Sequence, residues 1–296
     1  MNTDFMDTID AAYAKFSKGQ KAIANYIKNH YDKAAFMTAS RLGATVGVSE
    51  STVVRFATEI GFEGYPQLQR ALKEIVRNRL TSVQRMEVTN SRLWGSDVLD
   101  KVLRMDMDTI RRTMEETDKE TFYEAVAEIM DAKKIYIMGI RSAAALASFM
   151  TYYFTHIFED VRNVDTASTS VIFEQMLRIG AEDVFIGITF PRYSKRTLKA
   201  ATFAKSSGAR VIAITDSRSA PIAQIADYVL VAKSDIASFV DSLVAPLSLI
   251  NALIVAIGLE KKEEIAETYA RLESIWDEYN VYEKTNGEQD GHDSDI

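Results

Sequence analysis

The chain has 296 residues, no cysteine, 35 basic and 42 acidic side chains, and a formal net charge of -7 at pH 7. This length allows one or two domains with a large hydrophobic core. The lack of cysteine excludes disulfides and thiolate metal sites. The three histidines of the chain are scattered, so we expect neither a metal nor a cofactor.

Two features bear on where the protein works. The first ten residues, MNTDFMDTID, are acidic and lack the basic-then-apolar order of a secretory signal. The longest apolar run, Leu243 to Leu259, contains Pro246 and falls short of a membrane span. We therefore expect a cytoplasmic protein with no membrane partner, in which this run forms a buried core helix.

The charge is distributed unevenly along the chain. Residues 11–92 contain 13 lysines and arginines but only 6 acidic residues, so the remainder is strongly acidic. An excess of exposed lysines can arise by chance, but such asymmetry is typical of a protein with one nucleic-acid-binding end.

The basic segment has the pattern of a helix-turn-helix. Amphipathic helices are predicted over 7–16 and 18–31, and Thr38 then precedes a short helix that Gly47 ends. Ser49 is the expected N-cap of a second helix closed by Gly61. We expect four valines to pack between these two helices: Val46, Val48, Val53 and Val54.

In a helix-turn-helix, the second helix enters the major groove and presents its first residues to base edges. Short hydroxyls at this position suit phosphate or base contacts, and Arg55 has the length to reach a guanine. Polar residues at a helix start are also often merely solvated. The candidate DNA-binding residues are Thr38, Arg41, Ser49, Glu50, Ser51, Thr52 and Arg55.

The next segment connects two domains. A long helix is predicted from Gln67 to about Met86, and the residues 81–96 lack strong periodicity, so the domain boundary is expected there. A further helix follows over 97–116. Its apolar face is expected to comprise Val98, Val102, Met105 and Ile110.

From residue 118 onward, strand and helix patterns alternate. Buried strands are predicted at 134–138 and 161–164 and from Asp183, Arg210 and Tyr228, which indicates a five-stranded parallel sheet with helices on both faces. The predicted helices are 118–131, 143–158, 170–179, 241–259 and 260–283. The predicted domains are 1–80 (helix-turn-helix), 81–117 (linker and connecting helix), 118–284 (α/β domain) and 285–296 (disordered acidic tail).

The strand beginning at Asp183 ends in a loop suited to an anion. Loops at the carboxyl ends of parallel strands bind ligands, because the N-H groups and dipole of the following helix favour negative charge. The alternative is that Ser194 simply caps a helix and the basic residues face solvent. The loop and helix start carry hydroxyls at Thr189, Tyr193, Ser194 and Thr197 and cations at Arg192, Lys195 and Arg196.

These motifs resemble a known family. The runs 38–42, 47–49, 52–56 and 61–65 look like the N-terminal helix-turn-helix of the RpiR/MurR family of bacterial transcription regulators. Residues 135–227 resemble the SIS (sugar isomerase) domain that follows it in that family. The resemblance implies a regulator that binds double-stranded operator DNA, with an inverted repeat expected for a symmetric dimer or tetramer, and a SIS domain that binds a phosphosugar.

The SIS loops depart from the family pattern. The family's first loop is glycine-rich and has paired serines. Here Arg141 stands where a second glycine is expected, and Ser142 is the serine that remains. The second loop, in which the family has Ser-x-Ser-Gly-x-Thr, has arginine at 192 in place of glycine. Because a guanidinium forms a planar fork for phosphate or carboxylate, we expect an anion still to bind, either a phosphosugar or a carboxylate metabolite. The candidate effector residues are Arg141, Ser142, Thr189, Arg192, Tyr193, Ser194, Arg196 and Thr197.

Three alternatives stay open. A phosphosugar isomerase needs a positioned base, and only Glu174 and His156 offer one, since Arg196 stands where many SIS proteins carry an acid. A SIS domain whose arginines pair with acids needs no ligand and serves only for dimerisation. A module that bridges protein partners leaves the basic, capped N-terminal domain unexplained. No catalytic residue is therefore assigned.

Overall fold

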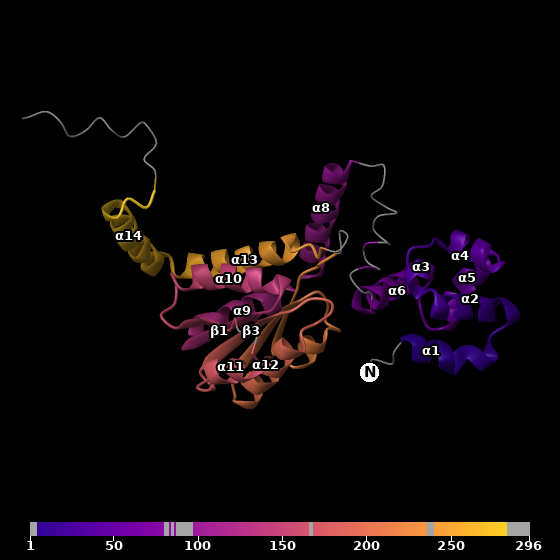
Figure 1. The fold of residues 1–296 in the computed structure, drawn as a ribbon, viewed down its shortest axis with the longest axis horizontal. Coiled ribbons are helices and arrows are strands. Elements are labelled where there is room, and N and C mark those ends of the chain that lie inside the picture. Colours follow the sequence, from indigo (N-terminus) through magenta and orange to yellow (C-terminus); the bar gives the residue numbers. More distant parts are fainter. Residues whose placement is uncertain are drawn as a thin grey trace, which may run out of the picture. The chain divides into compact units, whose positions relative to one another are not determined.

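The structure is a computed structural model that describes residues 5–79, 83, 86, 97–165, 168–235 and 240–282. The chain divides into two compact units, one of residues 1–108 with 235–242 and one of residues 109–234 with 243–296 (Figure 1). The division cuts helix α8 (Val98–Glu116) between residues 108 and 109. Most of the expected boundary segment 81–96 and the expected tail 285–296 lie outside the described residues.

The N-terminal unit is helical, and polar caps set its helix boundaries. Ser17 and Gln20 form a reciprocal capping box at the start of α2. Thr38 and Ser49 each accept a hydrogen bond from a backbone N-H of the helix that follows. The elements are α1 (Phe5–Ala12), η1 (Tyr13–Lys15), α2 (Lys18–Asn29), α3 (Tyr31–Ala34), α4 (Ala39–Val46), α5 (Glu50–Glu59) and α6 (Tyr65–Arg79).

One hydrophobic core holds these helices together. Fully buried side chains from α2, α4, α5 and α6 meet in it, among them Ile23, Leu42, Phe56 and Leu68. The predicted helix order and the turn between α4 and α5 are confirmed. The expected packing of Val54 is wrong, because its side chain is 38% exposed, whereas Val53 is fully buried.

The second unit is built on a parallel sheet, as predicted. The strand order is β2-β1-β3-β4-β5, and every neighbouring pair is parallel. Strand β3 lies at the centre between β1 and β4, and Gly139 of β1 lies opposite Ile188 of β3 at the carboxyl ends of the two strands. The strands are β1 (Lys134–Gly139), β2 (Val161–Asn163), β3 (Asp183–Ile188), β4 (Arg210–Thr215) and β5 (Tyr228–Val231).

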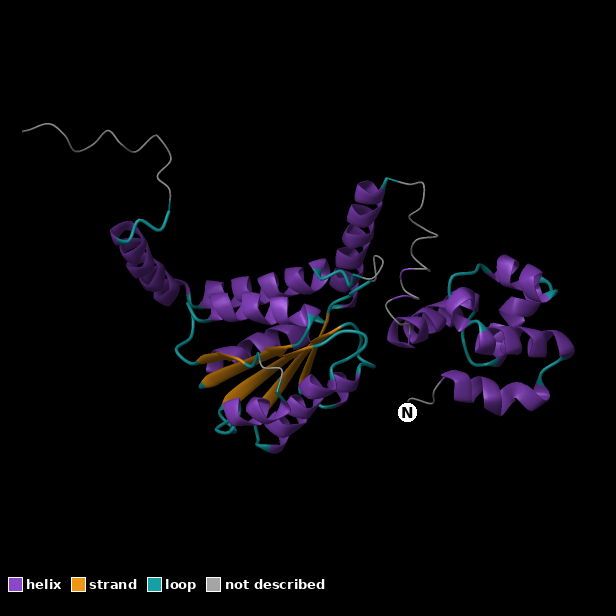
Figure 2. Ribbon diagram, viewed as in Figure 1, coloured by secondary structure: helices purple, strands orange, loops and turns teal. Residues whose placement is uncertain are grey.

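Helices cover both faces of this sheet, as Figure 2 shows. One face packs against α9 (Lys119–Asp131), α10 (Ser142–Phe154) and α13 (Val244–Glu260). The other packs against α11 (Thr169–Gln175), α12 (Lys195–Ser206) and η2 (Pro221–Gln224). Because both faces are covered, the central strands are almost continuously apolar. The last helix, α14 (Lys262–Glu278), has no buried residue.

The apolar face expected on the connecting helix is only partly correct. Val98 is 53% exposed and Ile110 is 38% exposed, while Val102 and Met105 are half-buried. The residues of α8 that are buried are two threonines, Thr109 and Thr113. The spacing of apolar residues cannot reveal this buried face, because its side chains are threonines that form hydrogen bonds through their hydroxyls.

Among the described residues, no single helix is long and apolar enough to span a membrane. Helices α13 and α14 meet that criterion only as a pair, and the pair bends by 100°.

Candidate nucleic-acid interface and anion site

The turn between α4 and α5 depends on close backbone approach. Gly47 ends α4 with a left-handed backbone, φ 75°, which favours glycine. The N-H of Val48 donates to the carbonyl of Gly43 at 2.9 Å. A Cβ atom at residue 43 would lie 2.7 Å from the carbonyl oxygen of Val48. Gly43 is thus a structural requirement of the turn that the sequence pattern did not reveal.

Helix α5 exposes its first turn and a half. The Ser49 hydroxyl lies 2.9 Å from that of Ser51 and 2.8 Å from that of Thr52, and it accepts the Thr52 N-H. Arg55 donates to the carbonyl of Ser51 at 3.4 Å and is exposed. The hydroxyls and the guanidinium therefore form one polar surface at the helix start.

The remaining candidates lie beside this surface. Thr38 caps α4 by accepting the N-H of Arg41 at 3.2 Å, and both residues are exposed. Glu50 is exposed at the first position of α5, and Thr52 is half-buried. The structure thus places all the DNA-binding candidates at the starts of α4 and α5, with only Thr52 partly covered.

The first loop of the sheet follows β1. A Cβ atom at Gly139 would lie 2.3 Å from the carbonyl oxygen of Ala143, so the strand meets the first turn of α10 too closely for any side chain. Arg141 has φ 63° and ψ -126°, and its side chain makes no capping hydrogen bond. Arg141 and Ser142 are exposed at the N-terminus of α10.

The second loop follows β3 and is held by its own hydroxyls. The buried Thr189 hydroxyl accepts the N-H of Ser194 at 3.1 Å. The Ser194 hydroxyl in turn caps α12 by accepting the N-H of Thr197 at 3.2 Å. Arg192, between them, is exposed and has φ 66°.

These loops leave the same edge of the sheet, because β1 and β3 are paired neighbours. Each runs into a helix N-terminus, so backbone N-H groups and two helix dipoles face this edge. Arg141 and Arg192 adopt a backbone that favours glycine, at a cost of about 1–3 kcal/mol each. The loops therefore keep a glycine-type backbone while adding two guanidinium groups.

The two remaining candidates lie on the first turn of α12, the helix that follows the second loop. Arg196 is exposed on the first turn of α12. Thr197 is fully buried, and its Oγ1 has no hydrogen-bond partner within the described residues. Arg196 therefore faces solvent beside the loop, whereas the Thr197 side chain is covered.

Sequence reasoning missed one member of this site. The Tyr193 hydroxyl donates to Oδ1 of Asp216 at 3.0 Å, and the Thr215 hydroxyl donates to the same oxygen at 3.4 Å. Asp216, only 5% exposed, follows β4 directly. An acid at the carboxyl end of a neighbouring strand is the signal in the sequence that could have identified it.

The two bases considered for an isomerase lie at or after helix C-termini, whereas these loops lead into helix N-termini. His156 follows the far end of α10, a helix about 20 Å long that begins directly after Arg141, and its Nδ1 lies 3.2 Å from the Tyr269 hydroxyl. Glu174 is exposed near the end of α11. The described residues also contain no group of three or more histidines or carboxylates suited to a metal.

Comparisons with known proteins match both units. A family model described as a helix-turn-helix domain of the rpiR family matches residues 3–79, and the SIS domain model matches residues 128–256. The chain belongs to the RpiR family of helix-turn-helix transcriptional regulators. The resemblance found in the sequence and the predicted fold class, a helix-turn-helix domain followed by a SIS domain, are both confirmed.

Two relatives are likewise described as HTH-type transcriptional regulators. An uncharacterised HTH-type transcriptional regulator of Clostridium perfringens is 26% identical over 73% of this chain and 77% of its own length. Another, from Haemophilus influenzae, is 26% identical over 76% of this chain and 78% of its own.

Two solved structures share the fold. The sugar isomerase domain of an RpiR transcription factor from Sphaerobacter thermophilus has a TM-score of 0.58 at 23% identity, covering 60% of this chain and 99% of that one. The Vibrio vulnificus NanR protein complexed with ManNAc-6P has a TM-score of 0.58 at 18% identity, covering 95% of this chain and 100% of that one.

Proposed function

We propose that the SIS domain of this regulator binds an anionic metabolite, in the first place a phosphosugar, and that this binding changes the affinity of the helix-turn-helix for its operator. The observation that carries the proposal is the pair Arg141 and Arg192, both at positive φ beside helix N-termini at one sheet edge. Strain of this kind persists where a site needs a particular geometry.

Each candidate residue has a chemical role in this proposal. The two guanidinium groups form the fork that grips the anion, and the N-H groups that begin α10 and α12 complete the cradle. Ser142, Ser194 and Tyr193 offer hydroxyls to the anion or its sugar. Thr189 and Thr197 support the loop from below, and Arg196 adds positive charge at its rim. The Vibrio relative in complex with a sugar phosphate supports this ligand class, with a carboxylate metabolite as the alternative.

On the DNA side, we propose that α5 enters the major groove. Arg55 and the hydroxyls of Ser51 and Thr52 then contact base edges, while Thr38, Arg41, Ser49 and Glu50 lie against the backbone or groove rim. Exposed apolar side chains on α13, namely Val244, Val255 and Leu259, support a homo-oligomer. A two-fold oligomer predicts an inverted-repeat operator.

We further propose that the protein is not an enzyme. Isomerisation requires a base within hydrogen-bond reach of the sugar. His156 follows the C-terminal end of α10 and Glu174 lies near the end of α11, whereas the loops proposed to hold the ligand lead into helix N-termini. Turnover of a sugar phosphate by the purified protein would contradict this part of the proposal.

The test has two steps. Duplexes that bind the full-length protein are selected from a random pool, and their affinity is then titrated with inorganic phosphate, glucose 6-phosphate, ManNAc-6P and small carboxylates. Arg192→Ala should abolish the response to the active anion and leave DNA binding without anion intact. The matched control is Arg178→Ala, an exposed arginine in the turn after α11. An unaltered response in Arg192→Ala contradicts the proposal.

A further inference from the structure

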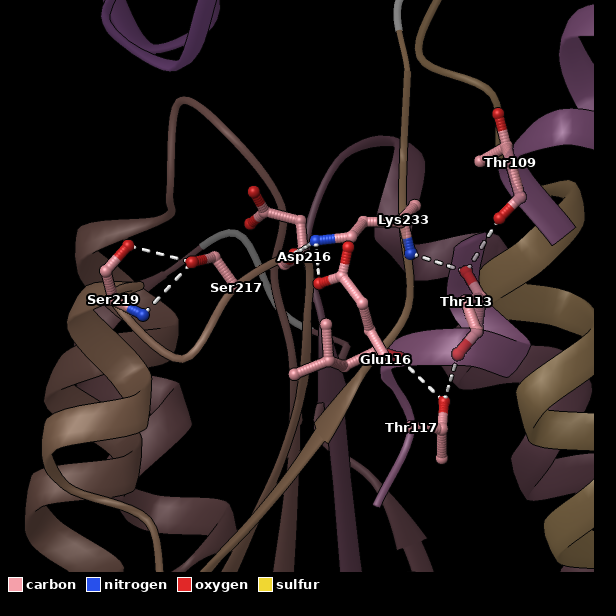
Figure 3. Close-up of polar contacts among 9 residues, drawn as sticks. Thr109, Thr113, Glu116, Thr117, Asp216, Ser217, Ser219 and Lys233 are labelled. Carbon is pink, nitrogen blue, oxygen red and sulfur yellow. Dashed lines mark hydrogen bonds and ion pairs between the residues drawn. The ribbon is translucent and has the colours of Figure 1, made fainter. Parts of the chain in front are cut away.

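Helix α8 contacts the end of strand β5 and the residues after it through the buried Thr113 and the half-buried Thr117 (Figure 3). The backbone N-H of Lys233 donates to the Thr113 hydroxyl at 2.8 Å, and this hydroxyl donates to the carbonyl of Thr109 at 2.9 Å. One turn on, the Thr117 hydroxyl lies 2.6 Å from the carbonyl of Thr113 in the same helix and 3.3 Å from the carbonyl of Val231. The last turns of α8 are thus held by specific hydrogen bonds in place of apolar packing.

A single ammonium group strengthens this attachment. Nζ of Lys233 lies 2.6 Å from Oε2 of Glu116 on α8 and also donates to the backbone carbonyl of Asp216 at 3.3 Å. The Lys233 side chain is only 14% exposed. The Glu116 side chain is 51% exposed, so solvent screens the pair in part, while the covered ammonium group remains within reach of both Glu116 and the Asp216 carbonyl.

Asp216 also contacts the candidate anion loop. Its carboxylate accepts the hydroxyl of Tyr193, which lies between Arg192 and Ser194. Continuous contacts therefore run from the loop after β3 through Asp216 and Lys233 to Glu116. Because α8 is one unbroken helix that extends from residue 116 back to residue 98, it crosses the division between the two compact units.

We propose that Lys233 couples the state of the anion loop to helix α8. This inference rests on the proposed function, since it says how the anion reaches the DNA-binding domain. With the loop empty, Lys233 bridges Asp216 and Glu116 and holds the last turns of α8. A bound anion competes for the Tyr193 hydroxyl and places negative charge near Asp216, which draws Lys233 away from Glu116 and loosens the helix.

Coupling of this kind requires that the anion binds the two states of the attachment with different affinity. The chemistry supplies that difference, because Lys233 is shared between two acceptors and cannot serve both equally once a further negative charge is present. Loosening α8 at residues 113–117 then changes the freedom of the helix-turn-helix that lies upstream on the same chain.

The first experiment needs no ligand. Hydrogen exchange of the α8 amides is measured in the full-length protein for wild type, Tyr193→Phe and Lys233→Met. Both variants should raise exchange at residues 109–117 by about fivefold or more, which corresponds to the net loss of one hydrogen bond. The control is Lys133→Met, which removes an exposed lysine paired with Glu182 at 3.3 Å at the opposite end of the strands. Unchanged exchange in Tyr193→Phe, with the protein folded, overturns the coupling.

The second experiment separates this inference from the proposed function. Glu116→Gln is titrated with the anion that the wild-type protein answers, and thermal shift and DNA affinity are both recorded. The anion should still raise the melting temperature of Glu116→Gln, whereas its effect on DNA affinity should fall at least about tenfold. A full DNA response in Glu116→Gln overturns the coupling. Failure of every anion to bind wild type overturns the proposed function instead, while the exchange experiment still decides the coupling.

Discussion

The two functional regions of this regulator obey local sequence rules to different degrees. In the helix-turn-helix, Thr38 and Ser49 cap their helices through their hydroxyls, and Gly47 takes the left-handed turn that its lack of a side chain favours. In the SIS loops, positive φ is carried by Arg141 and Arg192, which disfavour it. The first region is stabilised by its own sequence, whereas the second holds a geometry that its sequence opposes. Such opposition is typical of binding sites.

The largest effect is expected at the turn of the helix-turn-helix. Gly43→Ala places a methyl group 2.7 Å from the carbonyl oxygen of Val48, so α4 and α5 must separate. We expect the free energy of unfolding of this domain to fall by about 3 kcal/mol and DNA binding to be lost. Thermal unfolding followed by circular dichroism measures this.

Gly64→Ala is the control in the same domain, because a Cβ there meets only the Pro66 ring at 3.7 Å. Equal stability of Gly43→Ala and Gly64→Ala would show that the turn between α4 and α5 tolerates a side chain at residue 43.

The next effect sharpens the contrast at the SIS loops. Arg192→Gly removes the guanidinium but suits φ 66°, so affinity for the active anion should fall about 10- to 100-fold. The free energy of unfolding should nevertheless rise by about 1 kcal/mol, because relief of strain exceeds the extra chain entropy of glycine. Calorimetric titration and urea unfolding measure the two quantities.

The matched control is Asn280→Gly, which also replaces a residue at positive φ, 50°, but follows α14. Anion affinity should be unchanged in that variant. A loss of stability in Arg192→Gly would mean that the arginine holds the loop and is not strained for ligand binding.

A smaller effect is expected at the recognition helix. Arg55→Ala should weaken binding to a selected operator about tenfold, since a guanidinium-base contact is lost. Arg70→Ala, an exposed arginine on α6, serves as the comparison. Fluorescence anisotropy at two salt concentrations distinguishes a base contact from a phosphate contact. Loss of a phosphate contact reduces the slope of log affinity against log salt concentration by about one unit, whereas loss of a base contact does not. Identical affinities for the two variants would remove Arg55 from the interface.

The smallest effect concerns an acid at the start of β5. Burial acts to raise the pKa of Asp227, but hydrogen bonds from Lys205 and from the Val211 N-H, at 2.8 Å, outweigh it and leave the pKa lowered. Its stabilising contribution is therefore present above the unfolded pKa of about 4 and is lost as pH falls through the lower folded value.

Asp227→Asn should accordingly reduce the free energy of unfolding by about 1 kcal/mol at pH 7, and this difference should shrink below about pH 4. Urea unfolding across that range measures it, with the exposed Asp131→Asn as control. A difference that is constant with pH would exclude ionisation of Asp227 as the cause.

Most of the fold followed from the sequence because its signals are local. Caps, glycines and apolar strand runs specify each boundary within a few residues of the chain, so the helix-turn-helix and the five parallel strands were predicted in the correct order. Errors arose where burial depends on distant partners. Val54 was expected to pack inside, and the buried face of α8 was assigned to apolar residues, although Thr109 and Thr113 form it.

The sequence by itself therefore determined the two domains, the turn geometry and the strand ends from which the candidate residues project. Only the tertiary structure decided which side chains meet across the sheet edge. Tyr193, Asp216, Lys233 and Glu116 are separated by up to 117 positions, and their contacts follow from strand order and the docking of α8. No local pattern encodes such contacts, because they depend on how distant segments of the chain pack together.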